Sequence, residues 1–262
     1  GNVFLAYRNV AELDELIEKC MKTKTAVYNF TADDGIEHAV WIINDTAATE
    51  KITEIFKEQV PCTYIADGHH RAASAAKVRK ALGKDASPEA DYFLTTLFPA
   101  SQLQIMDYNR VVKDLNGLSP AKFLGALQDD FYVTHSPEPV KPSQLHEFGL
   151  YLDGKWYILT SRKGTWTEDP IGVLDVTILS HNILDKILDI KDQRTDNRID
   201  FVGGIRGLKE LEKRVDSGEM KIAFALYPVS LAQLIAIADS GNIMPPKSTW
   251  FEPKLKSGLV IN

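Results

Sequence analysis

Few residues in this sequence point to a secreted or membrane-bound protein. Cysteine occurs only twice in 262 residues, as Cys20 and Cys62, and neither belongs to a C-x-x-C pair. We expect both thiols to be buried and free, as in a reducing compartment. No apolar run approaches the ~18 residues that a membrane-spanning helix needs, and no signal-peptide core is present. These absences predict a cytoplasmic protein that does not bind a membrane.

Basic residues are also fewer than acidic ones. The sequence has 30 Lys and Arg residues against 36 Asp and Glu residues, so its formal net charge is -6. Proteins that wrap nucleic acid carry a basic stripe or patch, and the sequence has no such stripe. We therefore expect no nucleic-acid partner. The hydrophobic content of 44% and the charged content of 25% are those of an ordinary globular protein.

Two common signatures of phosphate binding are missing as well. Neither the P-loop pattern G-x-x-x-x-G-K-[ST] nor the dinucleotide pattern G-x-G-x-x-G occurs. A weak alternative is Gly203-Gly204 with Gly207, which lie between a predicted strand and a predicted helix. Such glycines could form an anion-binding loop, although a tight turn is the favoured interpretation. A phosphate site in this chain would therefore have to be formed by residues other than these two patterns.

Predicted strands and helices alternate along the chain, and hairpins are frequent. The clearest hairpin joins Phe148–Leu152 to Lys155–Thr160 through an Asp-Gly turn. This mixture predicts an α+β fold with a mixed sheet. Three prolines within residues 136–142 predict a linker. The expected domains are residues 1–135, which would bind phosphate, and residues 143–262, a C-terminal α+β domain.

The stretch Asp67–Arg71 has the most informative pattern. It reads Asp-Gly-His-His-Arg and lies between a predicted buried strand, Cys62–Ala66, and an alanine-rich helix predicted over Arg71–Leu82. The first N–H groups of a helix have no intrahelical partner, and the helix dipole makes this end partly positive. Two histidines and an arginine beside it would be unfavourable by a few tenths to about 1 kcal/mol each. This arrangement indicates that an anion occupies the turn.

Phosphate is the anion that suits these residues best. The planar fork of Arg71 matches phosphate oxygens, and Gly68 lets the backbone approach a ligand closely. The helix should pack tightly on a sheet through its small residues Ala72, Ala73, Ala75 and Ala76. A reading without a ligand also stands, with Asp67 as a plain N-cap and Arg71 as a surface residue paired with a carboxylate. Zinc is disfavoured, because adjacent histidines rarely face one ion.

A second stretch, Pro245–Thr249, also offers groups for an anion. Two prolines fix the backbone ahead of the ammonium of Lys247 and the hydroxyls of Ser248 and Thr249. These groups could hold a phosphate or a substrate carboxylate. The alternative is an ordinary polar loop, and the residues alone do not decide between the two.

The string Tyr64–Arg71 resembles the signature of a large bacterial and archaeal family of unknown function. That family is related to the free-serine kinases of the ParB/sulfiredoxin superfamily. The similarity covers essentially the whole chain. Further matching segments are Val3–Tyr7, Asp34–Trp41, Asp175–Leu184, Ile199–Val202 and the closing stretch from Asp216 to Asn262. The resemblance implies a ParB/sulfiredoxin-like core with a C-terminal α/β part.

The resemblance also implies roles for single residues. In the serine kinases, the Gly-His-His-Arg part binds nucleotide phosphates, and the aspartate lies beside the reacting hydroxyl. These roles would fall on Asp67 for catalysis and, for the phosphates, on Gly68, His69, His70 and Arg71. A Pro-Lys-Thr-Thr-like segment of the kinases corresponds to Pro246–Thr249, where the third residue is serine. ADP or ATP with Mg²⁺ is the implied cofactor, and no metal site of the protein's own is expected.

One part of the kinase pattern has no counterpart here. The kinases use a glutamate upstream of the motif as a general base, and full-length family members carry a Glu-containing motif in an N-terminal region. The chain opens at Gly1, without an initiator methionine and close to an apolar strand. We therefore expect a fragment that lacks that region. Glu37 precedes the motif but lies in a predicted hairpin, so we do not assign it the role. Loss of the base would reduce turnover more than binding.

Two functions remain open from the sequence. The first is a small-molecule kinase of the free-serine type, which transfers phosphate to a hydroxyl group. The second is a nucleotide-binding sensor without turnover. In both, the partner is a nucleotide or another small molecule. A DNA-associated protein, by analogy with ParB, is a third hypothesis that the acidic net charge disfavours.

Overall fold

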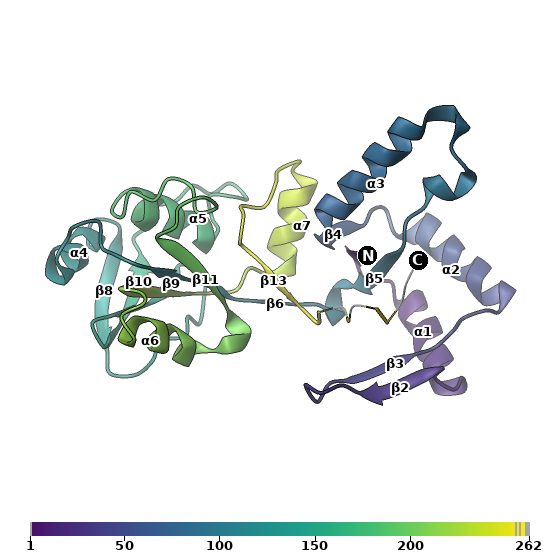
Figure 1. Cartoon of the computed structure of the whole chain (residues 1–262), viewed down its shortest axis with the longest axis horizontal. Helices are drawn as coiled ribbons and strands as arrows, with labels where there is room; N and C mark the ends of the chain where they lie inside the picture. The colour runs from purple at the N-terminus through teal and green to yellow at the C-terminus, as the bar shows by residue number, and fades with distance from the viewer. Residues whose placement is uncertain (1, 255, 257, 260–262) are drawn as a thin grey trace. The chain divides into compact units, whose positions relative to one another are not determined.

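The computed structural model describes residues 2–254, 256, 258 and 259. The end of the closing stretch, residues 260–262, lies outside the described residues. The chain forms two compact units (Figure 1): the first holds the residues up to Leu103, and the second spans Gln104–Lys254. Each unit contains both helices and strands, so the predicted α+β class is confirmed.

The first unit contains a three-stranded sheet with the strand order β4-β1-β5. The central strand β1 (Val3–Tyr7) pairs antiparallel with β4 (Tyr64–Asp67) and parallel with β5 (Thr95–Pro99). Its continuous apolar sequence suits a central strand, and four of its five residues are buried. The edge strand β4 ends at Asp67, opposite Phe4. The sheet therefore places the Asp-Gly-His-His-Arg turn at its edge.

Two helices and a hairpin extend the first unit. α1 (Ala11–Thr23) lies against α2 (Thr46–Gln59), and the hairpin consists of β2 (Tyr28–Thr31) and β3 (Glu37–Val40). A core cluster in this region consists of Tyr7, Val10, Leu13 and Ile55. The apolar spacing predicted both helices, and the bounds of α2 agree with that prediction.

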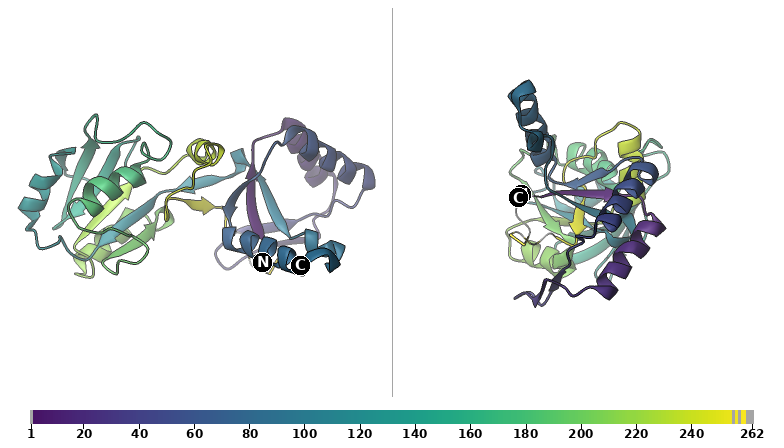
Figure 2. Two further views of the ribbon diagram at one scale, coloured as in Figure 1. Left: turned by 90° about the horizontal axis from the view of Figure 1, so that it is seen from above. Right: turned by 90° about the vertical axis from the view of Figure 1, so that its right-hand side faces the viewer.

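The third helix of the unit, α3 (His69–Leu82), has no buried residue. Figure 2 shows it on the opposite side of the sheet from α1 and α2. The prediction that its alanines pack tightly on a sheet is wrong: Ala73 and Ala76 are exposed, while Ala72 and Ala75 are half-buried. The reason is that α3 has no wide apolar stripe to bury against the strands.

The second unit is built on a six-stranded antiparallel sheet with the order β11-β7-β12-β9-β10-β8. Its strands are β7 (Tyr108–Val112), β8 (Phe131–Ser136), β9 (Glu147–Leu152), β10 (Lys155–Ser161), β11 (Ile199–Gly203) and β12 (Ile222–Leu226). Every residue of the inner strand β12 is buried. The predicted Asp-Gly turn joins β9 to β10 and sets their register.

Helices cover both faces of this sheet (Figure 1). On one face, α6 (Leu208–Asp216) buries Leu211 and Val215 in a cluster with Val111. On the other face, all five residues of α5 (Asp175–Leu179) are buried. The buried inner strands β9 and β12 and the buried helix α5 give the second unit an extensive core.

The remaining elements of the second unit are two helices and a strand pair. α4 (Pro120–Leu127) and α7 (Leu231–Asp239) both begin at serine N-caps, as the Ser-Pro pair predicted for α4. β6 (Gln104–Met106) and β13 (Trp250–Glu252) form a separate antiparallel pair. β13 begins at Trp250, directly after the Pro-Lys-Ser-Thr stretch, and pairs with β6, the first strand of the unit.

Three elements differ from the prediction. β7 was not predicted, because Asn109 and Arg110 interrupt its apolar pattern. β13 was not predicted, because it lies in a stretch rich in proline and lysine. The helix predicted over Val176–Leu188 consists of α5 followed by a π-helical segment, Ser180–Asp185. Polar residues in β7 and the composition around β13 thus gave no strand pattern, although pairing with strands distant in sequence stabilises both.

The division between the units does not coincide with the predicted linker. Residues 136–142 connect β8 to β9, two strands of one sheet, and the division falls after Leu103. The prediction for the thiols is half wrong: Cys20 is buried, but Cys62 is exposed. None of the helices in the described part of the chain combines the length and apolarity needed to cross a bilayer.

Candidate functional site

The turn between β4 and α3 is built on Gly68. This residue is the N-cap of α3 and has a φ of 89°, in the left-handed region that glycine adopts without strain. A Cβ at this position would lie 2.9 Å from Nη2 of Arg71, so the arginine folds closely over the glycine backbone. The helix therefore starts at His69, two residues earlier than predicted, and Asp67 is the last residue of β4 and not the N-cap.

The first amides of α3 are free for a ligand. The carbonyl of Gly68 accepts the N–H of Ala72 at 3.0 Å, which closes the first helical turn. The N–H groups of His69, His70 and Arg71 precede this bond and have no acceptor among the described residues. They lie at the positive end of a 14-residue helix, where a negative charge is favoured.

Arg71 is held only loosely. Its Nη1 donates to the carbonyl of Asn2, and its Nη2 lies 3.4 Å from Oδ2 of Asp67. The side chains of Arg71 and Asp67 are 45% and 58% exposed, so this ion pair contributes little to stability. An incoming anion can therefore take the fork of Arg71 in place of the carboxylate at small cost.

The two histidines complete the exposed rim of the turn. The rings of His69 and His70 have centroids 4.1 Å apart and are tilted by 47°. Both side chains are exposed, which suits donors to a solvent-facing ligand. Within the described residues, no three metal-ligating side chains gather in one place. The turn offers a single carboxylate, that of Asp67, and Mg²⁺ commonly binds through one or two carboxylates and the phosphates of its nucleotide.

The second predicted set, residues 247–249, lies in the second unit. Lys247 is exposed and has a φ of 58°. Ser248 is buried, and its hydroxyl donates to the carbonyl of Pro245 at 2.7 Å. Thr249 is half-buried. The turn thus leaves the ammonium of Lys247 at the surface and uses the hydroxyl of Ser248 internally.

The glycines at residues 203–204 have a packing explanation. A Cβ on Gly203 would lie 2.8 Å from Cε3 of Trp250, and one on Gly204 would lie 2.1 Å from Oδ1 of Asp107. The Gly204 amide also donates to the carbonyl of Asp107 at 2.7 Å. A carboxylate therefore already fills the space that an anion would need, and the tight-turn interpretation holds.

Two buried charged residues escaped the sequence analysis. Arg110 is fully buried in β7, and Asp175 is buried at the start of α5. Oδ1 of Asp175 accepts the backbone N–H of His146 at 2.8 Å, whereas Oδ2 has no partner among the described residues. Burial raises the pKa of Asp175 to about 7. The available signal was a charged residue inside an otherwise apolar strand or helix face.

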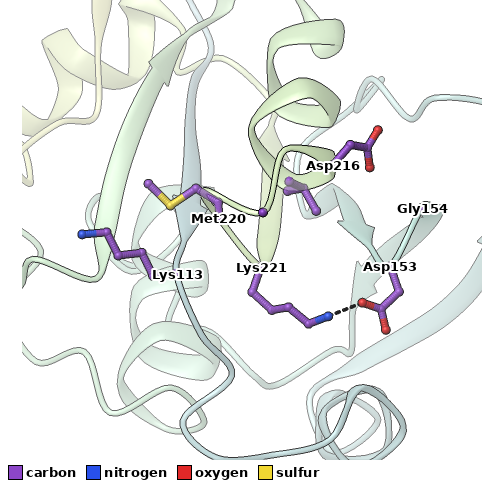
Figure 3. Close-up of a pocket in the computed structure, with 8 residues that line it drawn as sticks. Lys113, Asp153, Gly154, Asp216, Met220 and Lys221 are labelled. Carbon is purple, nitrogen blue, oxygen red and sulfur yellow. Dashed lines mark hydrogen bonds and ion pairs between the residues drawn. The ribbon is translucent and has the colours of Figure 1, made fainter.

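A pocket of about 310 Å³ lies at one end of the large sheet (Figure 3). Two of its charged groups, Lys221 and Asp153, are paired with each other, and a third, Asp216, accepts a hydrogen bond at 2.9 Å from the hydroxyl of Tyr151, which lies outside the pocket lining. Figure 3 also shows the ammonium of Lys113 pointing away from the Lys221–Asp153 pair. The pocket therefore does not gather free groups toward one ligand.

The chain matches a protein family model and is similar to several solved structures. No curated protein matches the sequence. Similar solved structures include a point mutant of free serine kinase in complex with AMP, with 13% identity, a TM-score of 0.40, and coverage of 96% of this chain and 88% of that one. A free serine kinase mutant in complex with ADP shows 15% identity, a TM-score of 0.39 and coverage of 95% and 83%.

A third similar structure is a conserved hypothetical protein from Pyrococcus furiosus, with 15% identity, a TM-score of 0.38 and coverage of 95% and 86%. TM-scores this low do not establish a shared fold. The match to a family model is the firmer finding, because it covers residues 1–177 and so more than half of the 262 residues. The chain therefore belongs to the family described as protein of unknown function (DUF1015).

Proposed function

We propose that the turn Asp67–Arg71 binds a phosphate group, and that the ligand which carries it is a nucleotide. The observation that supports this most is the set of three free amides at the start of α3, next to the loosely held fork of Arg71. The left-handed backbone of Gly68 lets the guanidinium of Arg71 lie close to the start of the helix. The resemblance of the motif to the nucleotide-binding signature of free-serine kinases supports the same ligand. In this proposal the first unit is the phosphate-binding domain, of ParB/sulfiredoxin type.

The geometry favours phosphate over a carboxylate ligand. Amides at a helix start and an arginine fork together offer more donors than the two oxygens of a carboxylate can use, whereas a terminal phosphate presents three oxygens. His69 and His70 are exposed at the same rim, and each ring offers an N–H donor. A doubly charged group also gains more from the helix dipole than a singly charged one.

The finer proposal is that the chain is part of a kinase that acts on a small molecule with a hydroxyl group, such as free serine. Asp67 is exposed beside the free amides, where it can orient a hydroxyl or contact the Mg²⁺ that a nucleotide brings. The alternative is a sensor that binds nucleotide without turnover. It is supported by the turn itself, whose only carboxylate among residues 67–71 is Asp67.

Calorimetric titration tests the binding proposal. ADP, ATP with Mg²⁺ and inorganic phosphate are titrated into wild type, Arg71→Ala and Arg79→Ala. Arg79 is the matched control, because it lies on the same helix but pairs with Asp91. We expect Arg71→Ala to weaken nucleotide binding by about 10- to 100-fold, the loss of a charge-assisted bond. Equal affinities in wild type and Arg71→Ala would refute the site.

A turnover assay separates the kinase from the sensor. Nucleotide consumption is followed with and without serine and other hydroxyl compounds, in wild type and Asp67→Asn. Hydroxyl-dependent consumption that Asp67→Asn abolishes, with nucleotide affinity retained, supports the kinase. Nucleotide binding with no acceptor-dependent consumption supports the sensor.

A further inference from the structure

Buried polar atoms without a partner are concentrated in one stretch of the second unit. Among the described residues, six buried side-chain atoms have no hydrogen-bond partner, and four of them belong to residues 161–177. These four are Oγ of Ser161, Nε1 of Trp166, Oδ2 of Asp175 and Oγ1 of Thr177. Folded proteins bond nearly all such groups to protein or to ordered water. Their concentration therefore indicates that this stretch binds something.

Three of these residues surround His146, which directly precedes β9. The N–H of His146 donates to Oδ1 of Asp175 at 2.8 Å, and its carbonyl accepts the N–H of Ser161 at 2.9 Å. The ring centroids of His146 and Trp166 are 4.1 Å apart. Nε2 of His146 lies 3.2 Å from the carbonyl of Val173, which can only accept, so Nε2 is the donor. His146 is thus the fixed common neighbour of Ser161, Trp166 and Asp175.

The hydroxyl of Ser161 lies on the same side of the sheet as Asp175. Side chains alternate between the two faces along a strand. On β10, the indole of Trp156 donates to Glu212 of α6 at 2.8 Å, so Trp156 faces α6. Ser161 follows at an odd spacing and therefore faces the other side, which α5 covers (Figure 1). Since Asp175 is the first residue of α5, the hydroxyl and the carboxylate both lie between the sheet and this helix.

The chemistry of the three groups decides what they can bind. Ser161 is 7% exposed and Asp175 is 2% exposed, so a ligand between them has to be very small. The indole N–H of Trp166 is a donor, the free carboxylate oxygen is an acceptor, and the hydroxyl can act as either. A cation would be repelled by the indole N–H, and an anion would be repelled by the carboxylate. Water donates and accepts, and buried waters typically make about three hydrogen bonds.

We propose that Ser161, Trp166 and Asp175 bind one internal water molecule beside His146. The water accepts the indole N–H of Trp166 and donates to Oδ2 of Asp175, and the hydroxyl of Ser161 makes the third bond. It thereby joins the end of β10, the loop that follows and the start of α5. Thr177 lies outside the site, because side chains two residues apart on a helix do not face each other. The site is independent of the proposed nucleotide site.

Urea denaturation of single and double variants tests whether the groups share one ligand. We expect Ser161→Ala and Trp166→Phe each to lower the folding equilibrium constant about tenfold, because each removes a buried hydrogen bond. The double variant should lose clearly less than about 100-fold, since the second change acts on a water that is already lost. Thr177→Val is the matched control: it removes a buried, unpartnered hydroxyl outside the site, and its effect should simply multiply with that of Ser161→Ala. No loss in Ser161→Ala, or independent effects of Ser161→Ala and Trp166→Phe, would overturn the site.

Two further measurements identify the ligand. Wild type is denatured in sodium, potassium and choline chloride at equal ionic strength, and we expect equal stability in all three. A high-resolution crystal structure should show one water within hydrogen-bonding distance of Trp166 Nε1, Ser161 Oγ and Asp175 Oδ2, and none at the indole of Trp156, which is bonded to Glu212. Stability that rises with sodium or potassium would assign the site to a cation and overturn the proposal. Direct bonds among the three side chains, with no water between them, would overturn it as well.

Discussion

The two units place an aspartate and an arginine in opposite surroundings. In the first unit, Asp67 and Arg71 are about half exposed and lie 3.4 Å apart. In the second unit, Asp175 and Arg110 are buried, and neither forms an ion pair among the described residues. Exposed charges near each other cost little and remain available to a ligand. Buried charges without a partner destabilise the unit that holds them unless they act on the structure or on a ligand.

The comparison explains why the sequence pointed to Asp67 and Arg71 but not to Asp175 and Arg110. The exposed turn follows from local sequence, because a glycine, a helix start and three basic residues are adjacent. The buried arginine acts across 137 residues of sequence through its bond to Lys247. Replacing Asp67 or Arg71 should therefore change stability little, whereas replacing Arg110 or Asp175 should change it strongly, in a direction that depends on the residue and on pH.

The largest expected effect is at Asp175. Its pKa is about 7 in the folded chain and 3.8 in its ordinary state, so the folded protein binds the extra proton between these values. Stability should therefore fall as pH rises from about 4 to about 7, by roughly 4 kcal/mol at most. Asp175→Asn should remove this slope and be the more stable form above pH 7. Urea denaturation from pH 4 to 8 measures the free energy of unfolding of both proteins. The same pH dependence in wild type and Asp175→Asn would contradict the argument that burial raises the pKa of Asp175.

The next effect concerns Arg110. Arg110→Ala leaves a cavity and unpaired carbonyls at Tyr108 and Lys247, and we expect it to lower the free energy of unfolding by about 3 kcal/mol. Arg110→Met should recover part of this loss, because it fills the volume and removes an unpaired charge. Chemical denaturation of the three proteins gives the values. If Arg110→Ala lowers the free energy of unfolding less than Arg71→Ala does, the contrast between the two units is wrong.

Arg214 provides an intermediate case, since it is partly buried but well paired. It contacts Asp200 at 2.7 Å and also pairs with Glu219, and it holds the pKa of Asp200 below its usual value despite burial, which acts in the opposite direction. We expect Arg214→Ala to destabilise the chain by about 1–2 kcal/mol, less at high salt. Denaturation at low and high ionic strength checks this. A cost independent of salt would point to lost packing and not to lost charge.

The smallest effect is expected in the first unit. Arg71→Ala should change the free energy of unfolding by no more than about 0.5 kcal/mol without ligand, because its ion pair is exposed. With a nucleotide at 100 times the wild-type dissociation constant, wild type should gain about 2.7 kcal/mol, and the variant, whose affinity is about 10- to 100-fold lower, only about 0.4–1.4 kcal/mol. Thermal unfolding with and without ADP measures both quantities. A large loss without ligand would show that Arg71 is a structural residue.

Much of the fold was predictable from local patterns. Apolar spacing predicted α2, the Asp-Gly pair predicted the β9–β10 hairpin, and Ser119 with its proline predicted the start of α4. The sequence could not show that β7 continues through Arg110, since a charged residue in a central strand depends on partners distant in sequence. The predicted domain boundary differs from the observed one for a related reason. The prolines of residues 136–142 indicated a connection between two elements, but only the strand pairing shows that it joins two strands of one sheet.

The candidate site was predictable in composition but not in detail. The motif pointed to Gly68 and Arg71, yet the cap proved to be Gly68 and not Asp67, because the left-handed backbone there starts the helix at His69. The alanines of α3 suggested packing that the helix does not make. Arg110 was missed because Asn109 and Arg110 are adjacent and together interrupt the apolar pattern of β7.

The central claim is that the first amides of α3 bind phosphate, and amide hydrogen exchange tests it most directly. Exchange rates at His69, His70 and Arg71 are measured by NMR with and without saturating ADP. We expect exchange at these three amides to slow when the nucleotide binds. At an ADP concentration near the wild-type dissociation constant, the slowing should be much smaller in Arg71→Ala, because its affinity is lower. Binding that leaves all three amides exchanging at their free rates would contradict the account.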